Sequence, residues 1–220
     1  GMQAAFVEVG LARTAFLHVD DIVAPDMQFD AQRVAATGAS GGPPGPPPDE
    51  RERSEDIRRL VSGGDDIVVQ VVKDPMGGKG ARLTTFISLP SRYLVFMPRG
   101  HGIGISARIE DEAERTRLRE IVQQMVSDGH AGGYIVRTAA HGVDADRLRA
   151  DLAYLERLWS HVRERSLRAS PGELVHEDLP LGLRMLRDEL GRGVLRVLVD
   201  DADELARLQK FVRDFIPNGA

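Results

Sequence analysis

The sequence predicts a mixed α+β protein, in which a strand-rich N-terminal part is followed by an α/β layer. Residues 1 to about 85 contain several short segments with strand character, one long loop and no helical pattern longer than a turn or two. From about residue 86, strand patterns alternate with helical patterns. The first arrangement is typical of an OB-like β-barrel. The second is typical of helices packed on a sheet.

Four segments of the N-terminal part are expected to be strands. Residues 5–9 and 14–19 flank a short turn and favour a pair of strands. Residues 67–72 are mostly β-branched and lie between an Asp-rich and a Pro/Gly-rich turn, which favours a buried strand. A fourth strand is expected from Ala81 through Ile87. No segment supplies the first strand of a complete barrel.

A Gly/Pro-rich insert interrupts the N-terminal part. Residues 37–48 consist only of Gly, Pro, Ala, Ser and Thr. The backbone of Gly is too free to hold a helix, and Pro lacks the amide donor that a helix or a strand ladder needs. We therefore expect a disordered insert over residues 36–56. A brief helical turn with Ile57, Leu60 and Val61 is expected to follow it.

The α/β part is expected to contain two long helices. Glu110–Ser127 carries apolar residues at helical spacing and acids in its first turn. Asp144–Arg168 carries a longer apolar stripe of the same period. The remaining expected elements are strands at residues 93–97, at 133–138, after Gly172 and at 194–199, and helices at Leu181–Leu190 and Ala202–Phe215.

Composition places the chain among ordinary soluble globular proteins. Of its 220 residues, 42% are hydrophobic and 29% are charged. No run of about 18 apolar residues exists that could span a membrane. The absence of Cys excludes disulfides and thiolate metal sites within this chain. A reducing, cytoplasmic setting is the expected location.

Positive charge gathers in one segment of an acidic chain. The formal net charge is −5. Residues 73–108 contain six Lys and Arg and one Asp, which gives this segment +5 and leaves −10 for the remainder. Because phosphate binding needs concentrated positive charge, this segment is a candidate binding face for a nucleic acid.

Arg137 and Thr138 stand where a predicted strand runs out towards Gly142. Strand ends of this kind are where α/β proteins present ligands. Arg offers a planar fork for two phosphate oxygens, and Thr adds a hydroxyl donor. From spacing alone, however, a solvated strand-end arginine is the favoured interpretation, because arginine is usually found at the surface.

Lys79, Phe6 and Phe16 are candidates for contacts with a nucleic-acid strand. Lys79 lies in a Gly-Gly-Lys-Gly turn that lacks the full phosphate-loop spacing, so the sequence argues against ATP binding. A Lys on a turn can still contact a nucleic-acid backbone, although a solvated turn is the default. An exposed Phe on an OB face would stack a base. Without further information, packing of both Phe side chains in a core is the favoured interpretation.

The remaining motifs do not indicate a catalytic centre. Residues 100–106 lack the third Gly of a dinucleotide fingerprint and are expected to form a flexible loop. The six His residues show no metal-ligand spacing, so no metal site is expected. The acidic doublets at residues 20–21, 65–66 and 200–201 are expected to be turn and cap residues, because neighbours on a strand point to opposite faces.

Several segments together resemble the ribonuclease E/G family. These segments are residues 2–10, 69–75, 79–85, 89–98 and 135–140, and the resemblance covers nearly the whole chain apart from the Gly/Pro insert. The residues around Phe6, Asp74-Pro75 and Pro90-Ser91 are closer to the ribonuclease G branch than to the ribonuclease E branch. The resemblance implies a bacterial single-strand-specific endoribonuclease that acts in rRNA processing and mRNA decay and prefers RNA with a 5′-monophosphate.

The resemblance also implies a division into domains and a set of contact residues. Residues 1–85 would be most of an S-one-type OB domain, 86–177 a 5′-sensor domain, and 178–220 part of an RNase-H-like subdomain. The resemblance reverses the interpretations made from residue type alone, which favoured solvated basic residues and Phe side chains packed in a core. The 5′-phosphate contacts would be Arg137, Thr138, the backbone amide of Ser91, where the family often has Gly, and Val95, which would pack on the terminal base; the RNA-binding residues would be Phe6, Phe16, Lys79 and Arg108.

The catalytic parts of the family have no counterpart in this chain. The family's magnesium-binding motifs, Asp-Ile-Asn and Asp-Phe-Ile-Asp, are absent, as are the paired Cys of its zinc link. We therefore expect no catalytic residue and no cofactor in these 220 residues, and leave enzymatic activity open. The expected partners are single-stranded RNA with a 5′-monophosphate and the remainder of the nuclease.

Two other functions remain open. The chain could be a noncatalytic structural or assembly module that packs on the missing nuclease domain. A self-sufficient hydrolase that uses Asp200 or Asp201 is the weakest alternative, because no second carboxylate with a fixed relation to them is evident.

Overall fold

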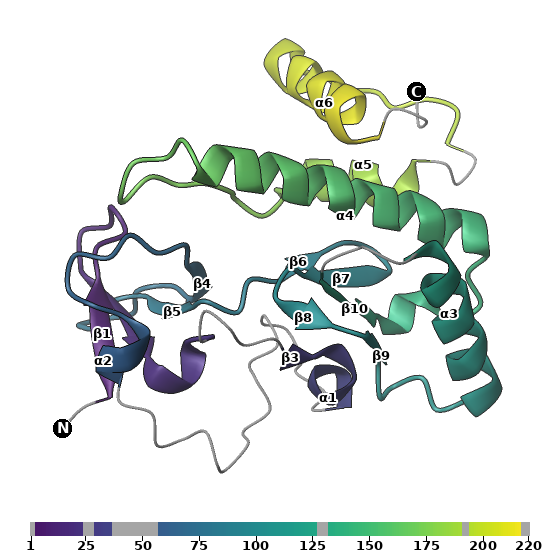
Figure 1. The fold of residues 1–220 in the computed structure, drawn as a ribbon. Helices are drawn as coiled ribbons and strands as arrows, with labels where there is room; N and C mark the ends of the chain where they lie inside the picture. Colours follow the sequence, from purple (N-terminus) through teal and green to yellow (C-terminus); the bar gives the residue numbers. More distant parts are fainter. Residues whose placement is uncertain (1–2, 24–28, 37–56, 127–131, 191–193, 217–220) are drawn as a thin grey trace.

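The computed structural model describes residues 3–23, 29–36, 57–126, 132–190 and 194–216. Residues 37–56, which make up nearly all of the predicted disordered insert, lie outside this part. The described residues form two four-stranded sheets, of which the second has helices on both faces, and one two-stranded sheet (Figure 1). The predicted mixed α+β class is therefore confirmed.

The first sheet contains the four strands predicted for the N-terminal part, but the prediction of a buried strand at residues 67–72 is wrong, because β4 lies at the edge of the sheet and Val71 is 44% exposed. Its order is β1-β2-β5-β4, with β1 and β2 antiparallel and β2 and β5 parallel. Its apolar face includes Leu17 and Leu83, both fully buried. Within the described residues this sheet does not close into a barrel, so the OB assignment stays a prediction. The bounds are β1 (Ala4–Val7), β2 (Ala15–His18), β4 (Gln70–Lys73) and β5 (Arg82–Thr84). The short helices are η1 (Val19–Asp21) and α2 (Ile57–Leu60), which confirms the predicted helical turn.

The second sheet forms the predicted α/β layer. Its order is β6-β7-β10-β9, with β10 antiparallel to β7 and parallel to β9. Two helices cover one face and bury Leu94, Leu118 and Leu155 completely. The bounds are β6 (Leu89–Pro90), β7 (Leu94–Met97), β9 (Ile103–Ile105), β10 (Gly133–Val136), α3 (Glu112–Met125) and α4 (Ala145–Ser166). A 3-10 helix, η2 (Thr138–Ala140), follows β10.

The prediction of a flexible loop at residues 100–106 is wrong. This segment forms β8 (Gly100–His101) and β9, and β8 pairs in parallel with β3 (Phe29–Asp30). Helix α1 (Ala31–Ala36) then packs on β9 and β10 (Figure 1). A Cβ at Gly104 would lie 2.2 Å from the carbonyl oxygen of Ala31, so the glycine permits this close approach. Residues 29–36 belong to the N-terminal part of the sequence, but they pack with the C-terminal part: β3 pairs with β8, and α1 lies on the second sheet.

Two predicted strands in the C-terminal part are also wrong. Neither the segment after Gly172 nor residues 194–199 is a strand. A strand needs a neighbouring strand with which to exchange hydrogen bonds, and the described residues supply none here. The helices α5 (Leu181–Glu189) and α6 (Ala202–Phe215) agree with the prediction, and α6 lies on the far side of α4 from the sheet (Figure 1).

An ion pair fastens the loop after β10 to helix α3. The carboxylate of Glu114 accepts hydrogen bonds from Arg117, at 2.6 and 2.7 Å, and from the backbone N–H of Gly142 at 2.7 Å. Arg117 also donates to the carbonyl oxygen of Val143 at 3.0 Å. The bond from Arg117, aided by that from Gly142, lowers the pKa of Glu114 from 4.5 to about 2, although partial burial opposes the shift. This pair holds the loop that follows η2.

We predict that Gly104→Ala destabilises the fold by about 1–3 kcal/mol, because the added methyl group overlaps the backbone of α1. Urea unfolding of both proteins measures the difference. Gly63→Ala is the matched control, since a Cβ there meets nothing within 4 Å. Equal losses in the two variants would contradict the close packing of α1 on β9.

We also predict that Glu114 contributes stability that depends on pH. Its folded pKa lies below the unfolded value, so the contribution is complete above the unfolded pKa of 4.5 and is lost as the pH falls towards about 2. Glu114→Gln should therefore lower the free energy of unfolding at about pH 7, and less so at about pH 3. Glu112→Gln, on the exposed side of the same helix, is the control. An equal loss at both pH values would rule out this linkage.

Candidate functional site

Two aromatic rings project from the open face of the first sheet. The antiparallel register of β1 and β2 places Phe6 opposite Phe16, and their ring centroids lie 6.2 Å apart, edge to face. Ala15 and Leu17, the neighbours of Phe16 along β2, are fully buried. Because successive strand residues alternate between faces, Phe16 points away from that core. Phe6 is 66% exposed, so the interpretation of Phe6 as a core residue is wrong.

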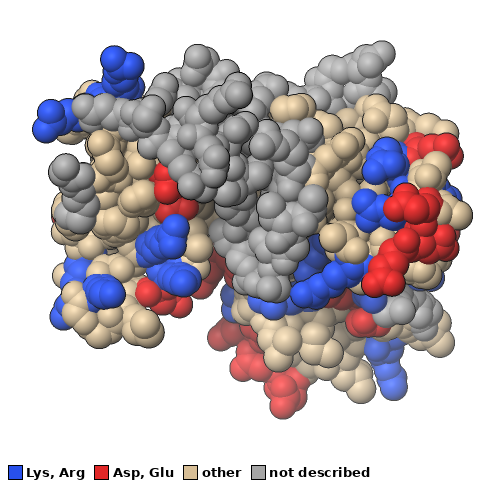
Figure 2. All heavy atoms as spheres, turned by 90° about the horizontal axis from the view of Figure 1, so that it is seen from below, with Lys and Arg blue, Asp and Glu red and all other residues tan. Residues whose placement is uncertain are grey.

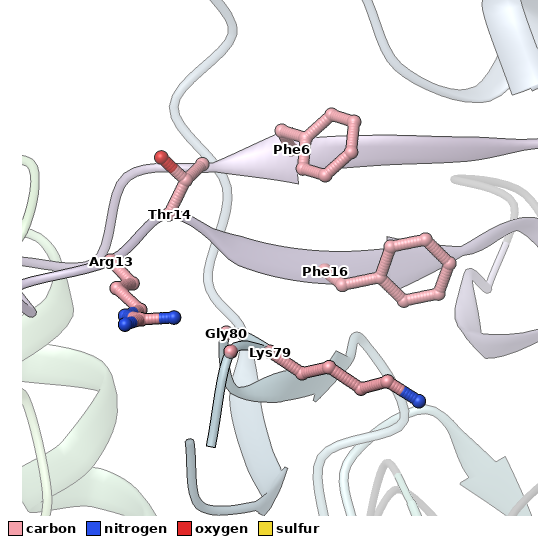
Figure 3. Close-up of a pocket in the computed structure, with 7 residues that line it drawn as sticks. Phe6, Arg13, Thr14, Phe16, Lys79 and Gly80 are labelled. Carbon is pink, nitrogen blue, oxygen red and sulfur yellow. The ribbon is translucent and has the colours of Figure 1, made fainter. Parts of the chain in front are cut away.

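The two rings line an open pocket of about 540 Å³. Figure 3 shows the Lys79 side chain extending below Phe16, and Arg13 on the other side of the pocket, below Thr14. Lys79 is held in place by a turn in which it exchanges backbone hydrogen bonds of 3.1 and 3.2 Å with Met76. The full lining comprises Phe6, Arg13, Thr14, Phe16, Gly78, Lys79 and Gly80.

Arg13 is a pocket residue that the sequence analysis did not select. It lies in the turn just before β2. Its position next to the strand that carries Phe16 is the sequence feature that could have identified it. Within the described part of the chain, neither Arg13 nor Lys79 forms an ion pair or a side-chain hydrogen bond. Two available cations beside two rings suit a ligand that carries both negative charge and a flat apolar surface.

A second group of candidates meets at the end of β10. The backbone N–H of Arg137 donates to the carbonyl oxygen of Tyr93 at 2.8 Å, and its guanidinium donates to the carbonyl oxygen of Ser91. The hydroxyl groups of Thr138 and Ser106 lie 3.2 Å apart. Both Arg137 and Thr138 are exposed. The structure thus brings Arg137 against the turn that carries Ser91, and Thr138 against Ser106, which follows β9.

Ser91 contributes to this group differently from the expectation. It is fully buried, and its backbone N–H donates to the carbonyl oxygen of Leu94 at 2.8 Å. Its hydroxyl donates to the carboxylate of Asp151. The amide that the resemblance assigns to phosphate therefore serves the turn in this structure, while the carbonyl oxygen of Ser91 holds Arg137.

Val95 and Arg108 lie on either side of this second group. Val95 is opposite Ile135 in the β7–β10 register and packs, partly exposed, against the core under α1. The backbone N–H of Arg108 donates to the hydroxyl of Ser106 at 3.4 Å, which places it near Thr138. The side chain of Arg108 is exposed.

The basic segment at residues 73–108 does not act as a single charged face. Arg82 forms an ion pair with Asp21 at 2.9 Å. Arg92 donates to the backbone of α5, and Arg99 to the carbonyl oxygen of Val23 at 3.0 Å. On the visible part of the face drawn in Figure 2, Lys and Arg form several separate groups beside Asp and Glu. Three of the six basic residues of this segment are therefore engaged within the protein, whereas Lys79 and Arg108 belong to the two groups described above.

Two of the three acidic doublets contain the predicted turn and cap residues, whereas Asp20 and Asp21 lie within η1 and the buried Asp21 forms an ion pair with Arg82. Asp65 accepts from the backbone N–H of Ser62 at 2.8 Å, and Asp201 caps α6 by accepting from Glu204 at 2.7 Å. Across the described residues, no three His, Cys, Asp or Glu side chains gather as metal ligands. The side chains found here thus do not fit the magnesium or zinc sites of the family that the sequence resembles. No helix in the same residues has the length and apolar character to cross a membrane.

Comparison with known proteins agrees with the sequence resemblance. A family model described as "Ribonuclease E/G family" matches residues 88–220. The chain is 43% identical to ribonuclease G of Salmonella typhimurium and to that of Escherichia coli K12, over 99% of this chain and 41% of each relative. It is 32% identical to ribonuclease E of a Nostoc species, over 98% of this chain and 28% of the relative. The chain thus spans well under half the length of these relatives. It belongs to the ribonuclease E/G family.

Proposed function

We propose that this chain is the RNA-binding and 5′-monophosphate-sensing part of a cytoplasmic, ribonuclease G-like endoribonuclease that acts in rRNA processing and mRNA decay. The observation that carries the proposal is the exposed pair Arg137 and Thr138 at the end of β10, in which the guanidinium of Arg137 is held by the carbonyl oxygen of Ser91. Family membership supports a function in RNA cleavage by the whole enzyme.

The chemistry of the β10 end suits a terminal phosphate. A phosphate monoester carries a charge of about −1.5 to −2 near neutral pH and three acceptor oxygens, whereas a 5′-hydroxyl group carries neither. The guanidinium of Arg137 has five N–H donors, and the bond to Ser91 occupies one of them. The others and the hydroxyl of Thr138 would bind the phosphate. In this proposal Val95 packs against the terminal base, and Arg108 contacts the following backbone.

The pocket on the first sheet suits the body of a single RNA strand. Unpaired bases expose flat faces, and stacking on an aromatic side chain contributes about 1–3 kcal/mol per base. Phe6 and Phe16 provide two such rings, and Lys79 and Arg13 would neutralise adjacent phosphates. Both interactions are independent of base identity, as a sequence-tolerant nuclease requires. The OB-type, RNA-binding role of residues 1–85 belongs to this proposal.

A second candidate function rests on exposed apolar side chains near the C-terminal end of the described chain. Leu195 is 99% exposed and Leu198 is 77% exposed, and Met185 on α5 is also largely exposed. Apolar surface of this kind usually marks a contact with another protein segment. We propose that residues 178–220 belong to an RNase-H-like subdomain that packs against the remainder of the nuclease. That remainder would supply the catalytic carboxylates.

We predict that Arg137→Ala removes the preference for a 5′-monophosphate. Charge-assisted hydrogen bonds of this kind are worth roughly 10- to 100-fold in affinity, so binding of a 5′-monophosphate oligomer should weaken by that factor while binding of the 5′-hydroxyl form stays unchanged. Fluorescence anisotropy at fixed low salt measures both.

The matched control is Arg168→Ala, an exposed arginine beyond the C-terminal end of α4. It should leave both affinities unchanged. Equal binding of the two RNA forms by the unmodified protein would remove the sensor assignment. If neither form binds, the packing function becomes the better proposal.

We predict that Phe6→Ala weakens the binding of 5′-monophosphate RNA and of 5′-hydroxyl RNA by the same factor. Loss of one stacked base corresponds to roughly 5- to 150-fold in affinity, and it should be independent of the 5′ end because the ring lies on the other sheet. Leu167→Ala is the control, because Leu167 is an apolar residue that is 82% exposed and does not line the pocket. Unchanged affinity in Phe6→Ala would show that the pocket does not bind RNA.

A further inference from the structure

A buried carboxylate lies behind the turn that holds Arg137. Asp151 projects from α4, is 8% exposed, and directs one oxygen, Oδ2, at the turn between β6 and β7. This oxygen accepts the hydroxyl of Ser91 and the backbone N–H groups of Tyr93 and Leu94, both at 2.9 Å. One atom thus gathers three donors from four consecutive residues.

The same turn holds Arg137 through two of its carbonyl oxygens. Ser91 accepts from the guanidinium, and Tyr93 accepts from the backbone N–H. Every donor that Asp151 binds therefore belongs to Ser91, to Tyr93 or to the adjacent Leu94. The carboxylate fixes the direction of the carbonyl oxygens that in turn fix the arginine.

We propose that Asp151 is a positioning residue for the 5′-phosphate site: its carboxylate sets the conformation of the 91–94 turn, and the turn aims the guanidinium of Arg137. This inference rests on the proposed function of Arg137, but its structural part stands without it. Asp151 does not contact the RNA, because it is buried beneath the turn. Its effect on binding should therefore appear in the discrimination between 5′ ends and not in the affinity for the RNA body.

The surroundings of Asp151 explain why a carboxylate can occupy this place. Burial raises the pKa of Asp151, while the bonds from Ser91, Tyr93 and Leu94 and the charge of Arg187 favour the ionised form. Arg187 lies on α5 and also donates to the carbonyl oxygen of Pro90 at 3.4 Å. Removal of the carboxylate would leave two buried N–H groups of the turn without acceptors, which the turn can repair only by changing shape.

The substitutions separate hydrogen bonding from charge. Asp151→Ala removes the acceptor, whereas Asp151→Asn keeps one oxygen that can accept from the same donors. Val162→Ala is the matched control for lost stability, because Val162 is buried on the same helix far from the turn. Urea unfolding first shows that each 220-residue variant is folded under the binding conditions.

The first readout is the ratio of affinities for 5′-monophosphate and 5′-hydroxyl RNA oligomers, measured by fluorescence anisotropy. In Asp151→Ala the ratio should fall on the order of tenfold towards one, while binding of the 5′-hydroxyl form is unchanged. Asp151→Asn should retain most of the ratio, and Val162→Ala all of it. A folded Asp151→Ala protein with the unmodified ratio would overturn the proposal.

The second readout requires no RNA. Amide hydrogen exchange followed by NMR reports the bond from the Arg137 N–H to Tyr93, and Asp151→Ala should accelerate it on the order of tenfold while Val162→Ala does not. If Asp151→Ala fails to fold, Ser91→Ala removes one of the three bonds and should accelerate the same exchange in part. Unchanged exchange in the folded variants would refute the positioning role. Accelerated exchange in a protein without any 5′ preference would instead refute the proposed function of Arg137.

Discussion

The buried strand β10 is the constraint on which the second sheet depends. All four of its residues are buried, and it is the strand that pairs with both β7 and β9. Position 133 of this strand is a glycine, which permits a close approach: a Cβ there would lie 2.9 Å from the backbone nitrogen of His101. The strand ends where the first charged residue, Arg137, follows Val136, since an unpaired guanidinium is costly to bury. The exposed position of Arg137 is thus a direct consequence of the apolar run before it.

Local signals in the sequence predicted the helices well and the strands less well. The bounds of α6 agree with the expectation, and those of α4 differ by one or two residues, because apolar spacing and the caps Asp144 and Asp201 act within a few residues. Strand formation at residues 194–199 depends on a partner that local sequence cannot reveal, and the described chain holds none. The prediction of a loop at residues 100–106 failed because the segment does have partners. These partners, β3 and α1, lie about seventy residues earlier in the sequence, where local patterns cannot reveal them.

The candidate site likewise contains residues that local sequence reveals and one residue that it does not. Arg137 and Thr138 were found because a strand end before a glycine is visible in the sequence, and Phe6 and Phe16 because aromatic residues on short strands are conspicuous. Family resemblance decided their interpretation as RNA contacts, which stays a prediction, and the structure adds that Phe6 is 66% exposed. Asp151 could not be found, because it is one of several acids on a charged helix and only its burial against a turn some sixty residues away distinguishes it.

The path of the chain between the two sheets determines how the protein can be divided. After β2 the chain forms β3, which pairs with β8, and α1, which packs on the second sheet. It then forms α2 and β4 beside the first sheet, and enters the second sheet at β6. At the far end of α4, Gly172 touches the backbone of Gly10. Cutting at residue 85 would therefore take α1 away from the strand it covers and open the core beneath Ile135. We therefore expect the two sheets to unfold as one cooperative unit. Neither residues 1–85 nor the residues that follow them should keep this structure as an isolated domain.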